Sequence, residues 1–334
     1  MTAGGDCPGL NAVIRAIVTR LTGEGHTAVV VMNGWEGLMR NDCRIMTRDD
    51  VRGLVSRGGT VLGTSRLDPY VHGDGYASIR STVEETGIDR LIVIGGDGTL
   101  RTAVRLELEG LGVIGVPKTI DNDLAGTDMT LGFDTAVQIV TDALDRLTTT
   151  AESHNRVIVV EVMGRTAGWI ALAAGIAGGA EAILIPEIAY DLDDLAAGIV
   201  RRHDSGKRYS IIVVAEGTPA PHGGIVETGS DAFGFDRMGG IGEVMGAELE
   251  RRTGFETRTV VLGHLHRGGI PTAFDRYLGT RLGVAAAELA IEGGSGMMVA
   301  LQRDEIVTVP LRDACGEPRR VDPARHDEAR WFSV

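Results

Sequence analysis

Short apolar runs recur along the chain, and each ends in a glycine-rich or polar turn. They occupy residues 27–34, 91–98, 112–118, 157–165, 182–187, 210–217 and 259–269, with the sequences TAVVVMNG, LIVIGGDG, GVIGVPK, VIVVEVMGR, AILIPE, SIIVVAEG and TVVLGHLHRGG. Apolar runs of this length are typical of strands buried on both faces of a parallel sheet. We therefore predict a largely parallel sheet covered by helices.

Helical periods lie between these runs. In residues 133–147, FDTAVQIVTDALDRL, the apolar positions fall at steps of three and four and form one stripe: Phe133, Ala136, Val137, Val140, Leu144 and Leu147. Alternating strands and helices predict a doubly wound α/β architecture. The length of 334 residues, 43% of them hydrophobic, suits two such domains.

The N-terminal segment departs from this alternation. The glycine turn GGDCPGLN and the predicted helix LNAVIRAIVTRL should follow a buried strand, but only Met1, Thr2 and Ala3 precede them. We expect the start of that strand to lie several residues upstream; the alternative is a fold that tolerates its loss.

Composition narrows the class of protein. A formal net charge of -13 argues against binding to a nucleic-acid backbone or an anionic membrane. Cys7, Cys43 and Cys315 are far apart and lack the spacing of a disulfide framework or a zinc site. No signal segment and no apolar run long enough to span a membrane is present in the sequence, so we expect a soluble cytoplasmic protein.

The turn IGGDGTL, residues 94–100, follows one of the predicted strands. Ligands of doubly wound folds bind beyond the carboxyl ends of the strands. Consecutive glycines let backbone N–H groups approach phosphate, and the Asp97 carboxylate could hold Mg²⁺. Alternatively, Gly95, Gly96 and Gly98 make a tight turn and Asp97 caps a helix. This string alone leaves both interpretations open.

The next strand ends in PKTIDND, residues 117–123. Charged residues usually lie in solvated loops, but the position beyond a buried strand favours a functional role for Lys118, Asp121 and Asp123. A carboxylate can take the proton of a substrate hydroxyl, and its neighbour can serve a metal. The lysine can neutralise a transferring phosphoryl group.

Two further turns place arginine beside glycine: Arg165 in VEVMGRTAGW, and Arg267 in VLGHLHRGG together with His264 and His266. The planar guanidinium binds phosphate oxygens in pairs. We assign His264 and Arg267 to an anion site and expect His266 to be a partly buried, hydrogen-bonded imidazole.

Arg156 and Arg258 stand at strand starts, where a surface salt bridge is the default expectation. The residues together predict a Mg²⁺-dependent phosphoryl transferase with a second anion pocket.

The ordered set GGDCPGLNAVIR, RGGTVLGTSR, IGGDGTL, PKTIDND, SHNR, VEVMGR, VVAEG, ETR and GHLHRGG resembles the bacterial 6-phosphofructokinase family from Gly4 to about Tyr277. The resemblance implies transfer of the γ-phosphoryl group of ATP to the 1-hydroxyl of fructose 6-phosphate, with Mg²⁺, in glycolysis. It also implies a nucleotide-binding domain, 1–132 plus about 259–305, and a sugar-phosphate-binding domain, 133–258 plus the C-terminal tail. A lipid or NAD kinase, a dehydrogenase or a non-catalytic paralogue explains fewer of these motifs.

The same resemblance implies the site residues. Those at the donor are Gly5, Arg66, Gly96, Asp97, Gly98, Thr99 and Lys118, with Asp97 on the metal. Those at the sugar phosphate are Thr119, Asp121, Arg156, Met163, Gly164, Arg165, Glu216, Arg258, His264 and Arg267. Asp121 is implied as the general base, supported by Thr119 and Asp123, while Arg66 and Arg165 stabilise the charge of the transferring group.

Quaternary structure and donor choice follow from the same comparison. Arg156 and Arg258 are implied to reach the sugar phosphate of an adjacent subunit, which overturns the salt-bridge expectation and predicts a homotetramer, with a dimer as the alternative. Gly98 resembles ATP users and Lys118 resembles pyrophosphate users. We predict ATP, because glycine leaves room for a nucleotide, and keep pyrophosphate as the alternative.

Two departures from the family pattern concern anion sites. HLHR replaces the usual His-x-Gln-Arg but keeps His264 and Arg267. Cations that bind the allosteric effector in regulated relatives are replaced here by Thr19, Thr148 and Ser205, while Arg15 and Lys207 remain. We therefore expect little or no activation by ADP.

Overall fold

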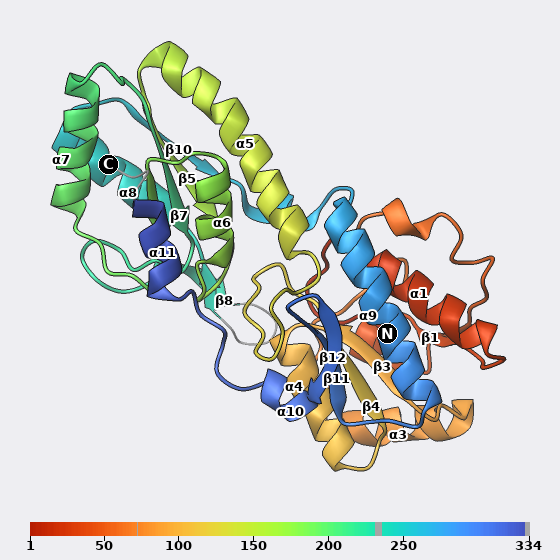
Figure 1. Cartoon of the computed structure of the whole chain (residues 1–334). Coiled ribbons are helices and arrows are strands. Elements are labelled where there is room, and N and C mark those ends of the chain that lie inside the picture. The colour runs from red at the N-terminus through yellow and green to blue at the C-terminus, as the bar shows by residue number, and fades with distance from the viewer. Residues whose placement is uncertain (72, 231–235, 331–334) are drawn as a thin grey trace. The chain divides into compact units, whose positions relative to one another are not determined.

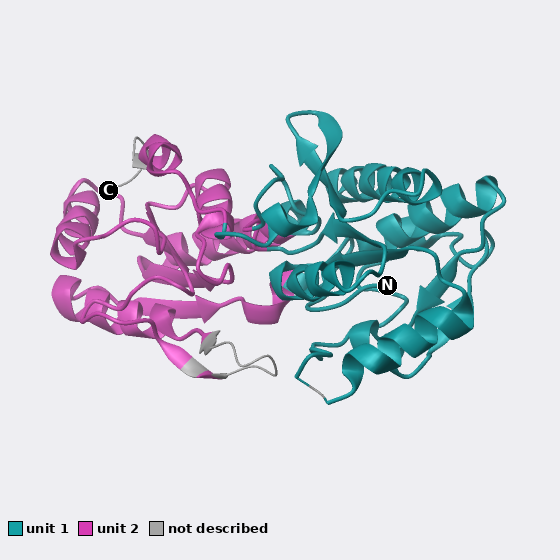
Figure 2. Ribbon diagram, turned by 90° about the horizontal axis from the view of Figure 1, so that it is seen from below, with its two compact units in different colours: residues 1–120, 124–135, 267–318 teal, residues 121–123, 136–266, 319–334 magenta. Residues whose placement is uncertain are grey.

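The computed structural model describes residues 1–71, 73–230 and 236–330, which divide into two compact units (Figures 1 and 2). Unit 1, teal in Figure 2, comprises residues 1–120, 124–135 and 267–318. Unit 2, magenta, comprises residues 121–123, 136–266 and 319 onward. Each unit is built on a four-stranded sheet flanked by helices, which confirms the predicted α/β class.

The sheet of unit 1 has the order β12-β11-β4-β3. Its strands are β3 (Leu91–Gly95), β4 (Val113–Pro117), β11 (Met297–Gln302) and β12 (Glu305–Pro310). The first three are parallel and β12 is antiparallel. Both β3 and β4 are buried at all five positions, as their apolar runs predict. Gly95 pairs with Pro117, so the two strands end together and their turns lie side by side.

Helices and a small separate sheet complete unit 1. The helices are α1 (Leu10–Gly23), α2 (Gly34–Met39), α3 (Gly75–Thr86), α4 (Asp97–Leu108), α9 (Ala273–Ile291) and α10 (Leu311–Ala314), with a 3-10 turn η1 (Leu54–Ser56). The small sheet pairs β1 (Val29–Val31) with β2 (Cys43–Ile45) in antiparallel register. The apolar sides of α4 and α10 pack on the main sheet through Leu100, Leu106 and Leu311.

Residues 1–3 lie alongside β3, next to the glycine turn. The Met1 amino group donates to the Ile92 carbonyl at 2.9 Å and Ala3 N–H donates to the Ile94 carbonyl at 3.1 Å. Thr2 forms a parallel bridge with Ile94. A cavity of about 490 Å³ lies beside these residues and is lined by Met1 together with residues of β1 and β3. The place expected for a strand before the glycine turn is therefore taken by a three-residue segment.

Unit 2 contains an all-parallel sheet of order β10-β5-β7-β6. Its strands are β5 (Val157–Val162), β6 (Ala182–Leu184), β7 (Ser210–Ala215) and β10 (Thr257–Val261). The accompanying helices are α5 (Phe133–His154), α6 (Trp169–Ala177), α7 (Leu192–Asp204), α8 (Ile241–Thr253) and α11 (Pro323–Arg330). On α5 the predicted stripe is buried at Ala136, Val140 and Leu144. The alternation of strand and helix thus holds in both units.

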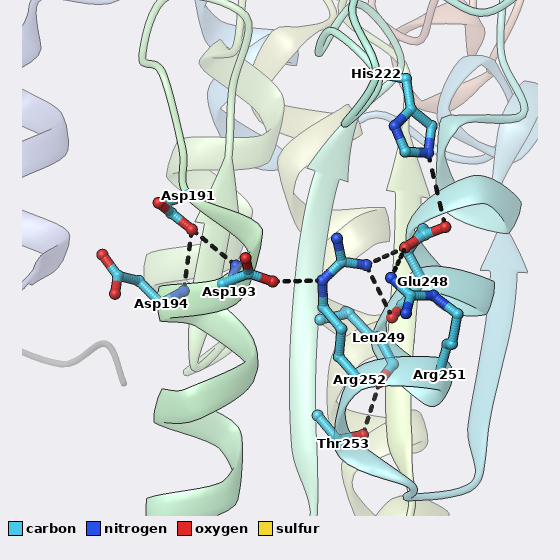
Figure 3. Close-up of polar contacts among 9 residues, drawn as sticks. All are labelled: Asp191, Asp193, Asp194, His222, Glu248, Leu249, Arg251, Arg252 and Thr253. Carbon is cyan, nitrogen blue, oxygen red and sulfur yellow. Dashed lines mark hydrogen bonds and ion pairs between the residues drawn. The ribbon is translucent and has the colours of Figure 1, made fainter.

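Polar contacts join two helices on the surface of unit 2 (Figure 3). Asp191 caps α7, because its carboxylate accepts the N–H groups of Asp193 at 2.8 Å and Asp194 at 3.1 Å. Arg252, at the end of α8, reaches the Asp193 carboxylate at 2.7 Å and also pairs with Glu248 on its own helix. The Asp193 side chain is largely exposed, so solvent screens this pair and it contributes little to stability.

One pair of strands lies outside the apolar runs from which strands were predicted. The segment 222–240 contains an antiparallel pair of strands, β8 (Glu227–Ser230) and β9 (Asp236–Met238), and residues 231–235 lie outside the described part. Residues 259–266 group with unit 2, because β10 pairs with β5, and residues 306–318 group with unit 1. No helix among the described residues is long and apolar enough to cross a membrane.

Candidate active site

The glycine turn after β3, which the resemblance implies as the donor side of the site, lies in unit 1. A Cβ at Gly95 would lie 2.3 Å from Thr99 Cγ2, so only glycine fits there. Gly96 precedes α4 in extended conformation, and Asp97, Gly98 and Thr99 form the first turn of the helix. The first N–H groups of a helix have no partner within it, and the helix dipole favours negative charge at this end. The turn therefore suits a phosphate group.

Asp97, the implied metal ligand, is held by a cation on its own helix. Arg101 Nε donates to the two carboxylate oxygens of Asp97 at 2.8 and 2.9 Å. Among the described residues no group of three or more His, Cys, Asp or Glu side chains could hold a metal ion. Mg²⁺ would fit here only with a single carboxylate and the phosphates of a donor, which is its usual arrangement. Sequence reasoning missed Arg101, although a four-residue Asp-to-Arg spacing on a helix signals such a pair.

Gly5, in unit 1, lies next to two cationic residues that were predicted for the site, Lys118 and Arg267. Its carbonyl accepts a hydrogen bond from Lys118 Nζ, and a Cβ on it would lie 2.6 Å from Arg267 Nη1. The same Arg267 nitrogen donates to the Asp6 carbonyl at 3.2 Å. Arg267, predicted to bind the sugar phosphate, thus contacts the donor-side turn in this structure. The structure brings Gly5, Lys118 and Arg267 together.

Arg66 and Thr119 extend this donor side. The Gly4 N–H donates to the Ser65 carbonyl at 3.0 Å, so the segment carrying Arg66 lies against the glycine turn. The Thr119 carbonyl accepts the Thr130 hydroxyl at 2.6 Å. Gly96 faces the same strand end, because a Cβ on it would lie 3.3 Å from the Lys118 carbonyl.

The loop 121–123 belongs to unit 2, and its first two residues are nearly inaccessible to solvent. Asp121 is 4% exposed and Asn122 is 1% exposed. Asn122 has a φ of 53°, in the left-handed region that few residues other than glycine adopt. Arg319, from the C-terminal segment, donates to the Asn122 carbonyl at 3.2 Å. Sequence reasoning missed Arg319, because the tail showed no recognisable motif.

The turn after β5, which the resemblance implies as the sugar side of the site, lies in unit 2. Met163 and Gly164 lead into Arg165, whose φ of 53° is again left-handed. Glu216, directly after β7, accepts the N–H groups of Gly164 at 3.3 Å and Arg165 at 2.9 Å through one oxygen, Oε1. A Cβ at Gly217 would lie 1.9 Å from the Arg165 carbonyl, so a glycine is required beside it. The structure therefore brings together Gly164, Arg165 and Glu216.

Glu216 has a perturbed acidity. Burial raises its pKa to about 7, and the negative charge of Asp121 adds to this rise, while the N–H groups of Arg165 and Gly164 oppose it. The carboxyl group therefore changes protonation near neutral pH. Its interaction with Asp121 also indicates that both carboxyl groups face one region of unit 2.

Arg156 and Arg258 lie at the opposite end of the same sheet. They stand at the starts of the paired strands β5 and β10, whereas Arg165 and Glu216 follow strand ends. Arg156 Nε contacts Glu256 Oε2 at 2.9 Å, and Arg258 contacts the other oxygen of Glu256. A single chain therefore shows both as salt bridges and does not bring them to Glu216.

The two histidines after β10 differ in environment. His266 is fully buried, and its Nδ1 is hydrogen-bonded to the Gly263 carbonyl, as expected for a structural imidazole. His264 is exposed. Of these two histidines, His264 is therefore the one that a ligand can reach.

Comparisons with known proteins agree with this architecture. The family model described as phosphofructokinase matches residues 1–290. The chain is 51% identical to pyrophosphate–fructose 6-phosphate 1-phosphotransferase of Amycolatopsis methanolica, covering 99% of this chain and 98% of that protein. It is 52% identical to ATP-dependent 6-phosphofructokinase of Chloroflexus aurantiacus, covering 97% of this chain and 92% of that protein.

Solved structures show the same fold. Phosphofructokinase of Saccharomyces cerevisiae superposes with a TM-score of 0.83 at 36% identity, covering 94% of this chain and 44% of that chain. Pyrophosphate-dependent phosphofructokinase of Nitrosospira multiformis gives a TM-score of 0.84 at 21% identity, covering 100% and 91%, and supports the fold alone. One family model matches most of the chain, and relatives that are about 50% identical to it cover nearly its whole length. The protein is an enzyme of the phosphofructokinase family.

Proposed function

We propose that this enzyme transfers the γ-phosphoryl group of ATP to the 1-hydroxyl of fructose 6-phosphate, in the cytoplasm and in glycolysis. One observation carries the proposal: β3 and β4 end in register at Gly95 and Pro117. The glycine turn that suits a phosphoryl donor therefore lies beside the turn that continues into Asp121. Products would be fructose 1,6-bisphosphate and ADP.

In this mechanism Asp121 is the general base. Its carboxylate takes the proton of the sugar 1-hydroxyl while that oxygen bonds to the γ-phosphorus and the bond to the β-phosphate oxygen breaks. Thr119 and Asp123 orient the base. Arg66 and Arg165 stabilise the charge on the transferring group. Near-complete burial of Asp121 strengthens these electrostatic effects, because little water screens them.

The donor phosphates bind to Gly5, Lys118 and the turn 96–99. Asp97 would hold Mg²⁺, which would neutralise negative charge on the donor phosphates. Because Arg101 occupies the Asp97 carboxylate, metal binding requires Arg101 to share or release that group.

The sugar phosphate binds mainly to residues that follow strands of unit 2. Met163 and Gly164 flank the sugar, and Glu216 accepts hydrogen bonds from its hydroxyl groups. His264 and Arg267, the first residue of the last segment of unit 1, bind the 6-phosphate. With a pKa of about 7, Glu216 is roughly half ionised at neutral pH. Sugar binding that needs the ionised carboxylate therefore strengthens as the pH rises through this value.

Pyrophosphate is the second candidate donor, favoured by the buried Lys118 and by relatives that carry that name. The deciding experiment is an assay of the purified enzyme with fructose 6-phosphate and Mg²⁺, comparing ATP with pyrophosphate. Turnover with ATP and little with pyrophosphate supports the proposal. Turnover with pyrophosphate alone replaces ATP by the alternative, and no turnover with either donor refutes both.

We further propose a homotetramer in which Arg156 and Arg258 reach the sugar phosphate of a neighbouring subunit. A complementation experiment tests this: Asp121→Asn and Arg258→Met are each inactive alone, and mixing them under conditions of subunit exchange restores part of the activity. Light scattering distinguishes a tetramer from a dimer. Absence of restored activity, with exchange verified by differential tags, contradicts the shared site.

A further inference from the structure

The C-terminal segment reaches the loop of the proposed general base through one residue, Arg319. The Arg319 N–H donates to the Asp123 carbonyl at 2.8 Å. Its guanidinium Nη1 donates to the Asn122 carbonyl at 3.2 Å, across 197 positions of sequence. Both contacts lie within unit 2. Arg319 thus binds two consecutive carbonyl groups that directly follow Asp121.

Arg319 is itself fixed by the first residue of α6. The indole N–H of Trp169 donates to the Arg319 carbonyl at 2.8 Å. The guanidinium carbon lies 4.2 Å from the centre of the Trp169 ring, within the range of a cation–π interaction. Trp169 is 6% exposed, so water competes little for either contact. Arg319 is therefore held in place by the buried side chain of Trp169.

A second anchor follows immediately along the chain. The Val321 N–H donates to Glu187 Oε1 at 3.0 Å, and the same carboxylate accepts the Gly168 N–H at 3.1 Å. Glu187 thus links the segment after Arg319 to the residue before Trp169. The position of Arg319 is set by two independent contacts with unit 2.

Asn122, inside this loop, has a left-handed backbone with a φ of 53°, a conformation that asparagine adopts more readily than other non-glycine residues. The contacts with Arg319 fix the two carbonyl groups of this turn. We propose that Arg319 is a positioning residue that holds the Asp121 carboxylate at the sugar hydroxyl, an inference that rests on the proposed function. A displacement of about 1 Å at a reacting group can cost ~100-fold in rate.

The test compares Arg319→Met with Arg320→Met, its exposed neighbour, so that each variant loses one arginine charge from the same segment. We expect Arg319→Met to lower kcat ~10- to 100-fold with a small change in KM for fructose 6-phosphate. Arg320→Met should match the wild type. Arg319→Lys keeps the charge and the backbone contact but loses the planar fork, so its kcat should lie between the two.

Hydrogen exchange of the peptide covering residues 118–124 gives a readout that does not depend on activity. Exchange should accelerate in Arg319→Met and stay unchanged in Arg320→Met. Wild-type kcat or unchanged exchange in Arg319→Met overturns the positioning role. A wild-type enzyme inactive with both donors refutes the proposed function instead. If Arg319→Met does not fold, Arg319→Lys decides by the same two measurements.

Discussion

The two units offer ligands different kinds of groups at the ends of their strands. In unit 1 the groups proposed for the donor are mostly backbone groups: the glycine turn after β3, the first turn of α4 and the Gly5 carbonyl, which accepts a hydrogen bond from Lys118. In unit 2 the groups proposed for the sugar are mostly side chains, among them Asp121, which is 4% exposed, and the half-buried Glu216, whose pKa is raised to about 7 by burial.

With the donor and the sugar bound as proposed, this difference predicts which specificity can vary within the family. Backbone N–H groups bind any phosphate, so one local side chain can decide between ATP and pyrophosphate. Buried carboxyl groups that bind hydroxyls reject ligands lacking them, because a polar group left unpaired is costly. Relatives of similar identity carry names with different donors, and both kinds of name fit a fructose 6-phosphate acceptor.

The largest expected effect tests the side chains proposed for the sugar in unit 2. Asp121→Asn removes the proposed base, so kcat should fall by about 10³-fold. Binding of fructose 6-phosphate, measured by calorimetry, should change little, because the amide keeps the shape of the side chain. Activity within tenfold of the wild type would remove Asp121 from the chemistry.

The next effect tests the backbone groups proposed for the donor in unit 1. Gly98→Asp adds a negative side chain in the first turn of α4, which should lower kcat/KM for ATP by about 100-fold through repulsion and leave pyrophosphate nearly unaffected. Lys118→Met is the matched control and should weaken both donors equally. Equal losses for both donors in Gly98→Asp would contradict a donor choice made at this position.

A buried carboxyl group in each unit permits a third comparison. Asp275 on α9 uses both oxygens: Oδ1 accepts the Gly132 N–H at 2.8 Å, and Oδ2 accepts the N–H and hydroxyl of Thr135. An asparagine has one acceptor oxygen and would leave donors unsatisfied. Asp275→Asn should therefore lower the free energy of unfolding by about 2 kcal/mol at pH 7, measured with urea.

Glu216 behaves differently, because both of its backbone contacts reach Oε1 and a glutamine can keep them. Its folded pKa, about 7, lies above the ordinary value of 4.5, so the folded state binds more protons between these values. Wild-type stability should therefore decrease as the pH rises from about 4.5 to about 7 and level off above.

In Glu216→Gln the part of this pH dependence that comes from Glu216 should disappear, and the part that comes from Asp275, whose pKa is raised to about 6 by burial, should remain. From pH 5 to pH 8, the free energy of unfolding of the variant should increase by about 1–2 kcal/mol relative to that of the wild type. Urea unfolding at the two pH values measures the gain. The same difference at both pH values would mean that Glu216 does not titrate in this range.

The smallest expected effect concerns regulation. Thr148 and Ser205 donate to carbonyls of Leu144 and Arg202 in or beside their own helices, at 2.9 and 2.7 Å, and supply no positive charge. ADP should therefore alter the fructose 6-phosphate saturation curve less than about twofold. A sigmoidal curve that ADP makes hyperbolic would contradict this expectation.

Features that depend on neighbouring residues were predictable from the sequence. The apolar runs predicted β3, β4, β5 and β7, and the stripe on α5 predicted its buried side, because burial repeats with the local backbone period. The family resemblance is likewise confirmed, since the phosphofructokinase family model matches residues 1–290.

Features that depend on distant contacts were not predictable. Nothing near Arg319 indicates a partner 197 positions away. The contact of Arg267 with the Asp6 carbonyl joins the first and the last sequence segments of unit 1. The β8–β9 pair was missed, because glycine-rich sequence around its strands resembles a loop. Tertiary structure decides such contacts, and the local pattern contains no record of them.

The interleaved order of the two units along the chain has a consequence for synthesis on the ribosome. All four strands of the unit 2 sheet have been made by Val261, but β4 of unit 1 waits for β11, which begins at Met297. Until then one edge of a fully buried, apolar strand has no partner, and such an edge invites pairing with other chains. Nascent chains between these two lengths are thus the form of this protein most exposed to aggregation.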